Sequence, residues 1–391
     1  MTLFLITFLL LYGGMHCYAY IRFKQSFRFS RRSSIIISSW LCFTTIAPVL
    51  VRLCEVNDFD LTAKAIAWPG FTWMGFIFIL VTILLTLDIF AMIVRQFSRR
   101  KRAATPYLFR PHITVEIAFL LALGITIYGY MEARNIQTNK ITIKTDKLSP
   151  TSNGIRVTQI SDVHLGLIIR EDRLNRMLQV VKESKPDILV STGDLIDGRL
   201  SLQDSIKSYQ KMTAMIAAVP APLGKYAVTG NHEYYAGLQQ SLDITEAAGF
   251  KLLRNGFITL PNGMTVSGVD DPAWKRMSLP APAISEEALL KSLPTGQFRL
   301  HLKHRPVVPP ETEGLFDLQL SGNTHHGQIF PFYLLTKFQF PIPSGTTNLK
   351  NDSKIHVSNG TGTWGPPIRF MAPPEVTIID IIPAKSPIVS N

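Results

Sequence analysis

Five short segments of the chain each place Asp, Asn or His at a point where a run of apolar, β-branched residues ends. In chain order they are Ser161-Asp162-Val163-His164, Gly193-Asp194, Gly230-Asn231-His232-Glu233, His304-Arg305-Pro306 and Gly322-Asn323-Thr324-His325. Carboxylates, imidazoles and amide oxygens delivered together are suitable ligands for two neighbouring divalent metals. Two adjacent metals can hold the attacking and leaving oxygens of a phosphate ester. The pattern therefore predicts metal-assisted hydrolysis of such esters.

Two of these segments can be interpreted from strand geometry alone. Asp162 and His164 are two residues apart, so at the end of a strand both side chains reach the same side and one ion. Asp194 follows the apolar run Ile188-Leu189-Val190, which is typical of a buried parallel strand. Ligands of open α/β sheets bind at the carboxyl edge of such strands. The alternatives are an ordinary turn for the first segment and a helix cap for Asp194.

The order and spacing of the five segments resemble the calcineurin-like metallophosphoesterase family, in its membrane-anchored bacterial type. The resemblance covers roughly Ile155 to Ile382. It implies a hydroxide held between two metals that attacks phosphorus, with Asp194 bridging the metals. It also implies that His232 assists the leaving oxygen as a general acid or an electrostatic partner. The implied ligands are Asp162, His164, Asp194 and His325 for the first metal, and Asp194, Asn231, His304 and Asn323 for the second.

The last segment departs from the family pattern. The usual Gly-His-x-His is Gly322-Asn323-Thr324-His325 here, and His326 replaces a usual glycine. Asn323 can still coordinate through its amide oxygen, which would weaken the second metal site, or the site could hold only one metal firmly. His326 could compensate, although adjacent side chains point apart. Nitrogen and oxygen ligands without sulfur allow Mn, Fe, Zn or Co.

The segment order from residue 154 onward predicts an α/β fold. Strands and helices alternate first, and strand-rich sequence follows, which suggests packed sheets with helices outside. The family resemblance implies two mixed β-sheets in a sandwich flanked by helices. The expected strands are Ile155–Ile160, Asp187–Ser191, Lys225–Val228, Phe257–Leu260, Met264–Val269, Phe298–Lys303, Asp317–Leu320, Lys354–Val357 and Val376–Ile382; the expected helices are Glu171–Ser184, Leu202–Ala217, Leu238–Ala248 and Glu286–Leu293.

The first third of the chain contains long, nearly continuous apolar runs. Four runs approach the ~20 residues that a helix needs to cross a bilayer. We therefore expect a four-helix transmembrane region over residues 1–134, a polar linker over 135–153 and the metallophosphoesterase domain over 154–391. Asp88 and Glu116 lie in or near the runs, where we expect structural helix contacts. The runs are Leu3–Tyr18, Ser34–Leu53, Phe71–Val94 and Ile113–Tyr130.

Charge between the runs predicts the orientation. The first and third loops are rich in Lys and Arg, for example Arg31 and Arg32 in the first and Arg99, Lys101 and Arg102 in the third. Basic loops stay in the cytoplasm, which places the N-terminus and the domain outside the cell membrane. No positive charge precedes the first run, so we do not expect a cleaved signal peptide.

Composition excludes two other classes of site. Residues 1–134 contain 14 Lys and Arg against 6 Asp and Glu, so most of the net charge of +12 is topological and no nucleic-acid partner is expected. Cys17, Cys42 and Cys54 fall in or beside the apolar runs. The domain therefore lacks the thiols for a disulfide framework or a thiolate metal site.

These observations predict a phosphodiesterase or phosphatase anchored at the outer face of a membrane. Topology alone suggests a lipid-linked substrate; a broad phosphoesterase that is merely tethered is a second enzymatic interpretation. The alternative from another class is a non-catalytic membrane sensor or binding protein that retains the fold with a weakened second metal site. Asn323 is the residue that raises this alternative.

Overall fold

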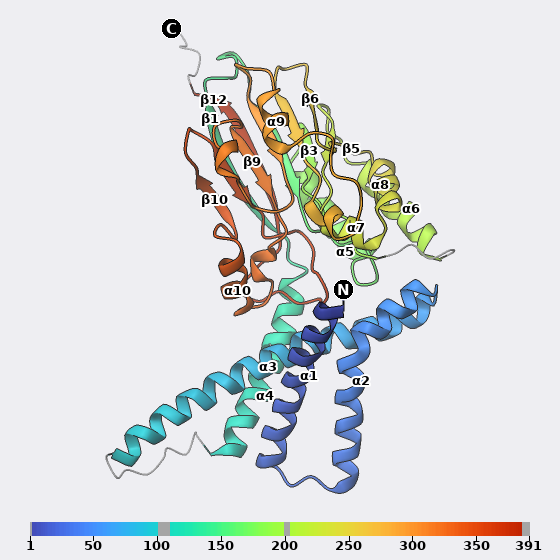
Figure 1. Ribbon diagram of the computed structural model, residues 1–391, viewed down its shortest axis with the longest axis vertical. Helices are drawn as coiled ribbons and strands as arrows, with labels where there is room; N and C mark the ends of the chain where they lie inside the picture. The colour runs from blue at the N-terminus through green and yellow to red at the C-terminus, as the bar shows by residue number, and fades with distance from the viewer. Residues whose placement is uncertain (1, 101–109, 199–203, 385–391) are drawn as a thin grey trace. The chain divides into compact units, whose positions relative to one another are not determined.

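A computed structural model describes residues 2–100, 110–198 and 204–384 of the 391. The chain forms two compact units (Figure 1). The first contains Met1–Met131 and Gly365–Phe370, and the second contains Glu132–Trp364 and Met371–Asn391. Each unit has its own buried apolar residues.

The first unit is helical, as the four apolar runs predict. Its helices are α1 (Thr2–Ser26), α2 (Arg31–Val56), α3 (Asp60–Arg100) and α4 (Pro111–Glu132). Within the described residues, three helices are long and apolar enough to cross a membrane: α2, α4 and the part of α3 over Asp60–Phe97. Three of the four predicted spans fall on these helices; the run Leu3–Tyr18 lies in α1, and its crossing of a membrane stays a prediction. Lys101 and Arg102 of the predicted basic loop lie outside the described residues.

Polar side chains among these helices are paired with one another. Asp88 accepts hydrogen bonds from the Tyr18 hydroxyl at 2.6 Å and from Arg22 Nη2 at 2.7 Å. His16 Nε2 accepts from the Trp73 indole at 3.0 Å. Such pairing lowers the cost of ionisable and polar groups in an apolar bundle. Asp88 thus makes the helix–helix contact expected for it.

The second unit contains two six-stranded mixed sheets with flanking helices, which confirms the predicted fold class (Figure 1). One sheet has the order β1-β12-β2-β3-β4-β5 and the other β10-β11-β9-β8-β7-β6. β2 to β5 run parallel, as do β7, β8, β9 and β11. The strands are β1 (Gln137–Thr145), β2 (Ile155–Ile160), β3 (Ile188–Ser191), β4 (Lys225–Ala227), β5 (Lys251–Leu252), β6 (Gly256–Thr259), β7 (Thr265–Gly268), β8 (Arg299–Leu302), β9 (Leu318–Ser321), β10 (Gly345–Asn348), β11 (Lys354–Val357) and β12 (Glu375–Pro383).

Helices and two apolar clusters complete the domain. On α5 the predicted apolar face is buried, from Leu174 to Val181, and packs with Ile160 and Leu189. A second cluster joins residues of both sheets, including Val190 and Leu300. The helices are α5 (Glu171–Glu183), α6 (Asp204–Ala217), α7 (Asn231–Ala236), α8 (Leu238–Ala247), α9 (Glu286–Lys291) and α10 (Phe332–Gln339), with 3-10 turns η2 (Pro272–Lys275), η3 (Pro310–Thr312) and η4 (His325–Gly327).

The predicted linker over 135–153 is wrong for its first half. Residues 137–145 form β1, which pairs in parallel with β12 from Gln137 opposite Glu375 onward. β1 is an edge strand, and most of its side chains are exposed or half-buried while Ile143 is buried. One face of an edge strand is exposed to solvent, so its composition is as polar as that of a linker. The sequence alone therefore did not distinguish β1 from a linker.

Candidate metal centre

The predicted ligand segments all follow carboxyl ends of parallel strands. The loops after β2, β3 and β4 belong to one sheet, and those after β8 and β9 belong to the other. Backbone hydrogen bonds join neighbouring loops: Asp162 N donates to Gly193 O at 3.0 Å, and Gly322 N to His304 O at 2.8 Å. Parallel strands end at a common edge, so residues far apart in sequence meet there.

Five of these residues adopt left-handed backbone. The φ angles are 52° at Asp162, 55° at His164, 53° at Asp194, 70° at Asn323 and 50° at His325. This conformation is uncommon outside glycine, although Asp, Asn and His tolerate it better than most residues. Strained backbone that clusters in one place is typical of functional sites.

Glycines beside the carboxylates allow the loops to approach closely. A Cβ at Gly230 would collide with the carboxylate of Asp194, and one at Gly322 would collide with Asp162 and Ser161. In the Gly-Asn pairs 230–231 and 322–323, glycine is therefore required because neighbouring atoms leave no space for a Cβ. Any side chain there would separate the predicted ligands.

A first cluster of possible metal ligands contains Asp162, His164 and His325, all buried. His164 Nε2 and His325 Nε2 are 3.1 Å apart, and His325 Nε2 is 3.4 Å from Asp162 Oδ1. Two atoms that are each about 2.1 Å from one ion are about 3.0–3.4 Å apart for octahedral or tetrahedral angles. The spacing therefore fits three ligands of one divalent ion.

A second cluster contains Asp162, Asp194 and His304. His304 Nδ1 lies 2.8 Å from the carbonyl oxygen of Thr192, which accepts its proton and leaves Nε2 as the ligand nitrogen. His304 Nε2 is buried, faces Asp194 Oδ2 at 3.2 Å and has no hydrogen bond within the described residues. Asp194 Oδ2 is also 3.9 Å from His164 Nε2 of the first cluster. Asp194 thus belongs to the second cluster and also approaches a ligand of the first, while Asp162 is a member of both clusters. The donor atoms fit divalent metals.

A third cluster, of His164, Asp197 and His232, includes a residue that the sequence interpretation missed. Asp197 Oδ1 is 2.7 Å from His232 Nδ1 and 3.5 Å from His164 Nδ1. The available signal was a second carboxylate three residues after Asp194 in Gly193-Asp194-Leu195-Ile196-Asp197. Asp197 orients the His232 ring and fixes which nitrogen faces away from it.

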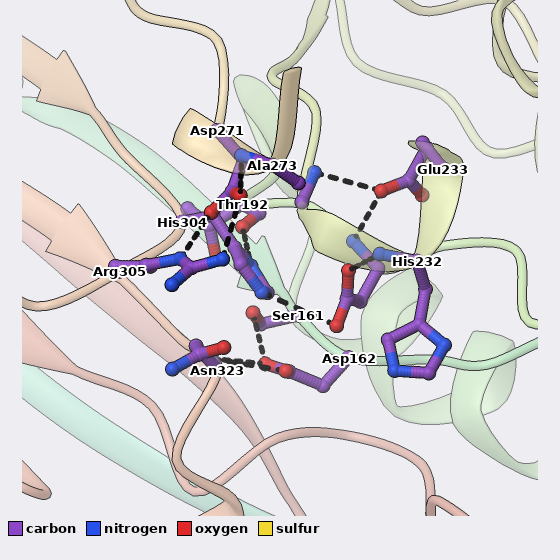
Figure 2. Close-up of polar contacts among 12 residues, drawn as sticks. Ser161, Asp162, Thr192, His232, Glu233, Asp271, Ala273, His304, Arg305 and Asn323 are labelled. Atoms are coloured by element: carbon purple, nitrogen blue, oxygen red, sulfur yellow. Dashed lines mark hydrogen bonds and ion pairs between the residues drawn. The ribbon is translucent and has the colours of Figure 1, made fainter. Parts of the chain in front are cut away.

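Glu233 joins two of the ligand loops. Its buried carboxylate accepts backbone N–H groups from Asp194 at 3.0 Å, Leu195 at 2.7 Å and Gly230 at 2.7 Å. Asp162 is held similarly by the Ser161 hydroxyl and by the backbone N–H of Asn323 (Figure 2). Both carboxylates therefore fix loop positions through charge-assisted hydrogen bonds.

The remaining predicted residues lie at the edge of these clusters. Asn231 is the first residue of α7, and Asn323 contacts both Asp162 oxygens through its backbone N–H at 2.9 and 3.0 Å. Their amide groups remain predicted ligands. The His326 ring stacks on Tyr333 at 4.6 Å, and its Nδ1 is 3.2 Å from Asn359 Oδ1. His326 therefore makes its contacts with Tyr333 and Asn359, and its compensating role stays a prediction.

Burial and neighbouring charges shift the pKa values of the residues in the centre in opposite directions. Burial alone would raise the pKa of Asp194, but the charges of His304 and His232 outweigh it and lower that pKa. Burial alone would lower the pKa of His304, yet Asp194 raises it to about 10. The pKa of His232 rises to about 9 because Asp194 and Asp197 outweigh burial. Without metal, imidazole protons balance the carboxylates, and a bound cation would displace the proton of a ligand histidine.

Residues 155–327 match the family described as calcineurin-like phosphoesterase. An uncharacterized metallophosphoesterase of Aquifex aeolicus (strain VF5) is 39% identical over 262 residues, which is 67% of this chain and 97% of that protein. The chain belongs to this family. Its members are typically metal-dependent, and the Asp and His clusters are able to bind metal.

Two further relatives bear on the rest of the chain. The uncharacterized metallophosphoesterase YkuE of Bacillus subtilis (strain 168) is 31% identical over 65% of this chain and 89% of its own length. A Danio rerio protein named transmembrane protein with metallophosphoesterase domain is 25% identical over 84% of this chain and 76% of its own length. The three apolar helices and such relatives together indicate association with a membrane.

Proposed function

We propose that this chain is a membrane-anchored phosphoesterase that hydrolyses phosphate monoesters or diesters with two divalent metals. The observation that carries the proposal is the position of Asp194, 3.2 Å from His304 and 3.9 Å from His164, between two groups of ligands. A two-oxygen carboxylate in that position suits a bridging ligand. The first metal would take Asp162, His164, Asp194 and His325, and the second Asp194, Asn231, His304 and Asn323.

The residues around the metals divide the remaining work. Bound divalent metals supply Lewis-acid stabilisation of the phosphoryl oxygens and lower the pKa of water. His232 donates a proton to the leaving oxygen; in the metal-free protein, Asp194 and Asp197 outweigh burial and raise its pKa to about 9. Asp197 holds the imidazolium in place through Nδ1. Glu233 keeps the loops of Asp194 and Gly230 at fixed separation.

The experiment is hydrolysis of bis-p-nitrophenyl phosphate and p-nitrophenyl phosphate by the full chain in detergent, after chelation and re-addition of Mn²⁺ or Zn²⁺. Metal-dependent turnover that is lost in Asp194→Asn and kept in Asp243→Asn supports the proposal. Asp243 is a matched control because it lies on α8 and bonds to Gln239. The ratio of the two substrates separates diesterase from monoesterase activity. Metal-independent turnover, or turnover kept in Asp194→Asn, contradicts it.

Asn323 supports a second candidate, a binding protein that retained the fold and lost turnover. It occupies the position of a second-metal histidine in the family pattern. If the wild type hydrolyses neither p-nitrophenyl ester and Asn323→His hydrolyses one of them, this candidate would be favoured.

We also propose that the domain faces outward and acts on a lipid-linked phosphate ester. The basic loops of the helical region support the orientation. A membrane-impermeant maleimide should label Lys291→Cys on intact cells, in a background where Cys17, Cys42 and Cys54 are serine. Labelling only after lysis would place the domain inside. Faster turnover of a lipid ester than of bis-p-nitrophenyl phosphate would support the substrate.

A further inference from the structure

Helix α10 exposes an apolar face to solvent. Leu334 is 60% exposed, Leu335 63% and Phe338 93%. At positions i, i+1 and i+4 these side chains lie on one side of a helix. Phe330 and Phe332, just before them and at the helix start, are also exposed. Monomeric soluble proteins rarely keep large adjacent apolar side chains in water, so such a face marks an interaction site.

The opposite side of α10 fastens the helix to the domain. Thr336 is buried, and the ring of Tyr333 stacks on His326 at 4.6 Å. Phe340, directly after the helix, is buried as well. The polar threonine therefore faces inward and the leucines face outward, which reverses the usual amphipathic arrangement. The exposed face is held in place by this packing.

Chain connectivity and hydrogen bonds link α10 to the rim of the metal centre. α10 follows η4, which contains the predicted ligand His325. Two hydrogen bonds link Gln328, between η4 and α10, to the backbone of Trp364, at 2.9 and 2.8 Å. Trp364 is 51% exposed, and its ring centroid is 5.6 Å from that of His232. An exposed aromatic ring thus lies against the predicted general acid and is hydrogen-bonded to the segment that precedes the helix.

We propose that this surface inserts into the lipid bilayer to which the chain is anchored. We name it the insertion surface; it consists of Phe330, Phe332, Leu334, Leu335, Phe338 and Trp364. Only residues 133–136 separate the end of α4 from β1, a tether of at most about 15–18 Å. A domain held this close to a bilayer meets lipid at far higher local concentration than a second copy of itself.

The chemistry of the surface fits the membrane interface. Trp settles at the depth of the headgroups, because its ring is apolar and its indole N–H is polar. Phe and Leu form the apolar face of helices that lie in the membrane interface. Lys337 is the charged residue of α10 and suits anionic headgroups. Seated in this way, the neighbouring metal centre would meet phosphate at headgroup level. The substrate class is then a phosphate-bearing membrane lipid, and this last step rests on the proposed function.

Insertion is tested without catalysis, with the full chain in nanodiscs and its three native cysteines replaced by serine. A fluorophore is attached at Phe338→Cys or, as control, at Lys291→Cys. Lys291 is exposed on α9, which lies at the far end of the domain from α10 (Figure 1). Lipids with a nitroxide on the upper acyl chain should quench the label at 338 strongly and the label at 291 weakly. Equal quenching at both positions overturns insertion. If two unlabelled Phe338→Cys chains form a disulfide cross-link, and the labelled chain is not quenched by nitroxide, the surface would be assigned to a second copy.

The substrate is tested with Phe338→Glu and the matched control Phe257→Glu. Phe257 is an exposed phenylalanine on β6, at the opposite edge of its sheet from β10. Phe338→Glu should lower hydrolysis of phosphatidic acid in the nanodisc about tenfold and leave bis-p-nitrophenyl phosphate hydrolysis unchanged. Phe257→Glu should change neither rate. Nitroxide quenching without turnover of phosphatidic acid would support membrane insertion and would contradict a lipid phosphate monoester as the substrate. Loss of turnover on both substrates in every chain would instead contradict the proposed function.

Discussion

The metal centre and the insertion surface depart from ordinary protein surfaces in opposite directions. The centre buries carboxylates, with Asp162 fully buried and Asp194 2% exposed, whereas α10 leaves Phe338 93% exposed. Burying charge and exposing large apolar side chains both cost free energy in water. Each region is therefore incomplete by itself: cations would neutralise the first, and a bilayer would cover the second.

Their comparison also separates two kinds of support. The centre is held by many polar contacts, such as those of Glu233 with three consecutive backbone N–H groups. The α10 part of the insertion surface is supported from beneath by buried Thr336 and by Tyr333, which stacks on His326. Substitutions should accordingly be severe in the centre and mild for folding on the surface.

The largest effect is expected at the carboxylate between the clusters. Asp194→Ala should lower kcat/KM on bis-p-nitrophenyl phosphate about 10³-fold or more, because metal-ligand contacts supply several kcal/mol of transition-state stabilisation. Steady-state kinetics with saturating Mn²⁺ checks this. A loss smaller than tenfold would mean that Asp194 is no bridging ligand.

The next effect is expected at Asp197, which contacts His232 at 2.7 Å and lies 3.5 Å from His164, a proposed ligand of the first metal. Asp197→Asn should lower kcat/KM by about 10–100-fold. Asp197 helps to raise the pKa of His232 to about 9, so its loss lowers that pKa and deprotonates the general acid earlier. The alkaline limb of the pH–rate profile should therefore move to lower pH. An alkaline limb that stays in place would exclude His232 as the general acid that Asp197 supports.

Loss of a loop-fixing carboxylate should cost stability. Glu233→Gln places an amide NH₂ against backbone N–H donors and should destabilise the protein by about 3 kcal/mol. In a domain of this size that corresponds to a fall in Tm of about 6–12 °C. Thermal unfolding of the full chain measures it, with Glu246→Gln on α8 as a control at an exposed glutamate. Equal melting temperatures of the wild type and Glu233→Gln would show that the four backbone N–H contacts of Glu233 contribute no net stability.

Metal binding should depend on pH in a defined direction. The pKa of His304 is raised to about 10, so its contribution to the stability of the metal-free protein is complete below pH 6.5 and is lost as the pH rises towards 10. A metal must displace this proton, so its affinity should rise with pH by up to about tenfold per unit. The increase in Tm on adding Mn²⁺ should therefore be larger at pH 8 than at pH 6. An increase that is equal at both values would show that His304 binds no metal.

The smallest effect is expected on the insertion surface. Leu335→Ser should change the free energy of unfolding in detergent by less than about 0.5 kcal/mol, because its side chain is mostly exposed. Chemical denaturation measures this against Leu174→Ser, where the same substitution removes a buried side chain of α5. A similar loss in both variants would show that the α10 face is covered within the protein.

Two histidines on one strand end show how far the sequence could be interpreted. His304 precedes Arg305-Pro306 in a family-like segment, and the structure places it beside Asp194. His301, three residues earlier and without such a segment, is buried against Ser267 and Glu286. The local motif separates the two, whereas residue type alone does not. Asp197 had no such motif in the interpretation and was missed.

Local pattern determined much of this protein: the helical runs, most strands and the residue types that could bind metal, since each depends on neighbours only a few positions away. The tertiary structure alone decided the rest. It paired β1 with β12 from the other end of the chain, placed Asp194 between ligands from two sheets and turned the leucines of α10 outward. These outcomes depend on which distant segment covers each face, and hydrophobic periodicity specifies a face without specifying its partner.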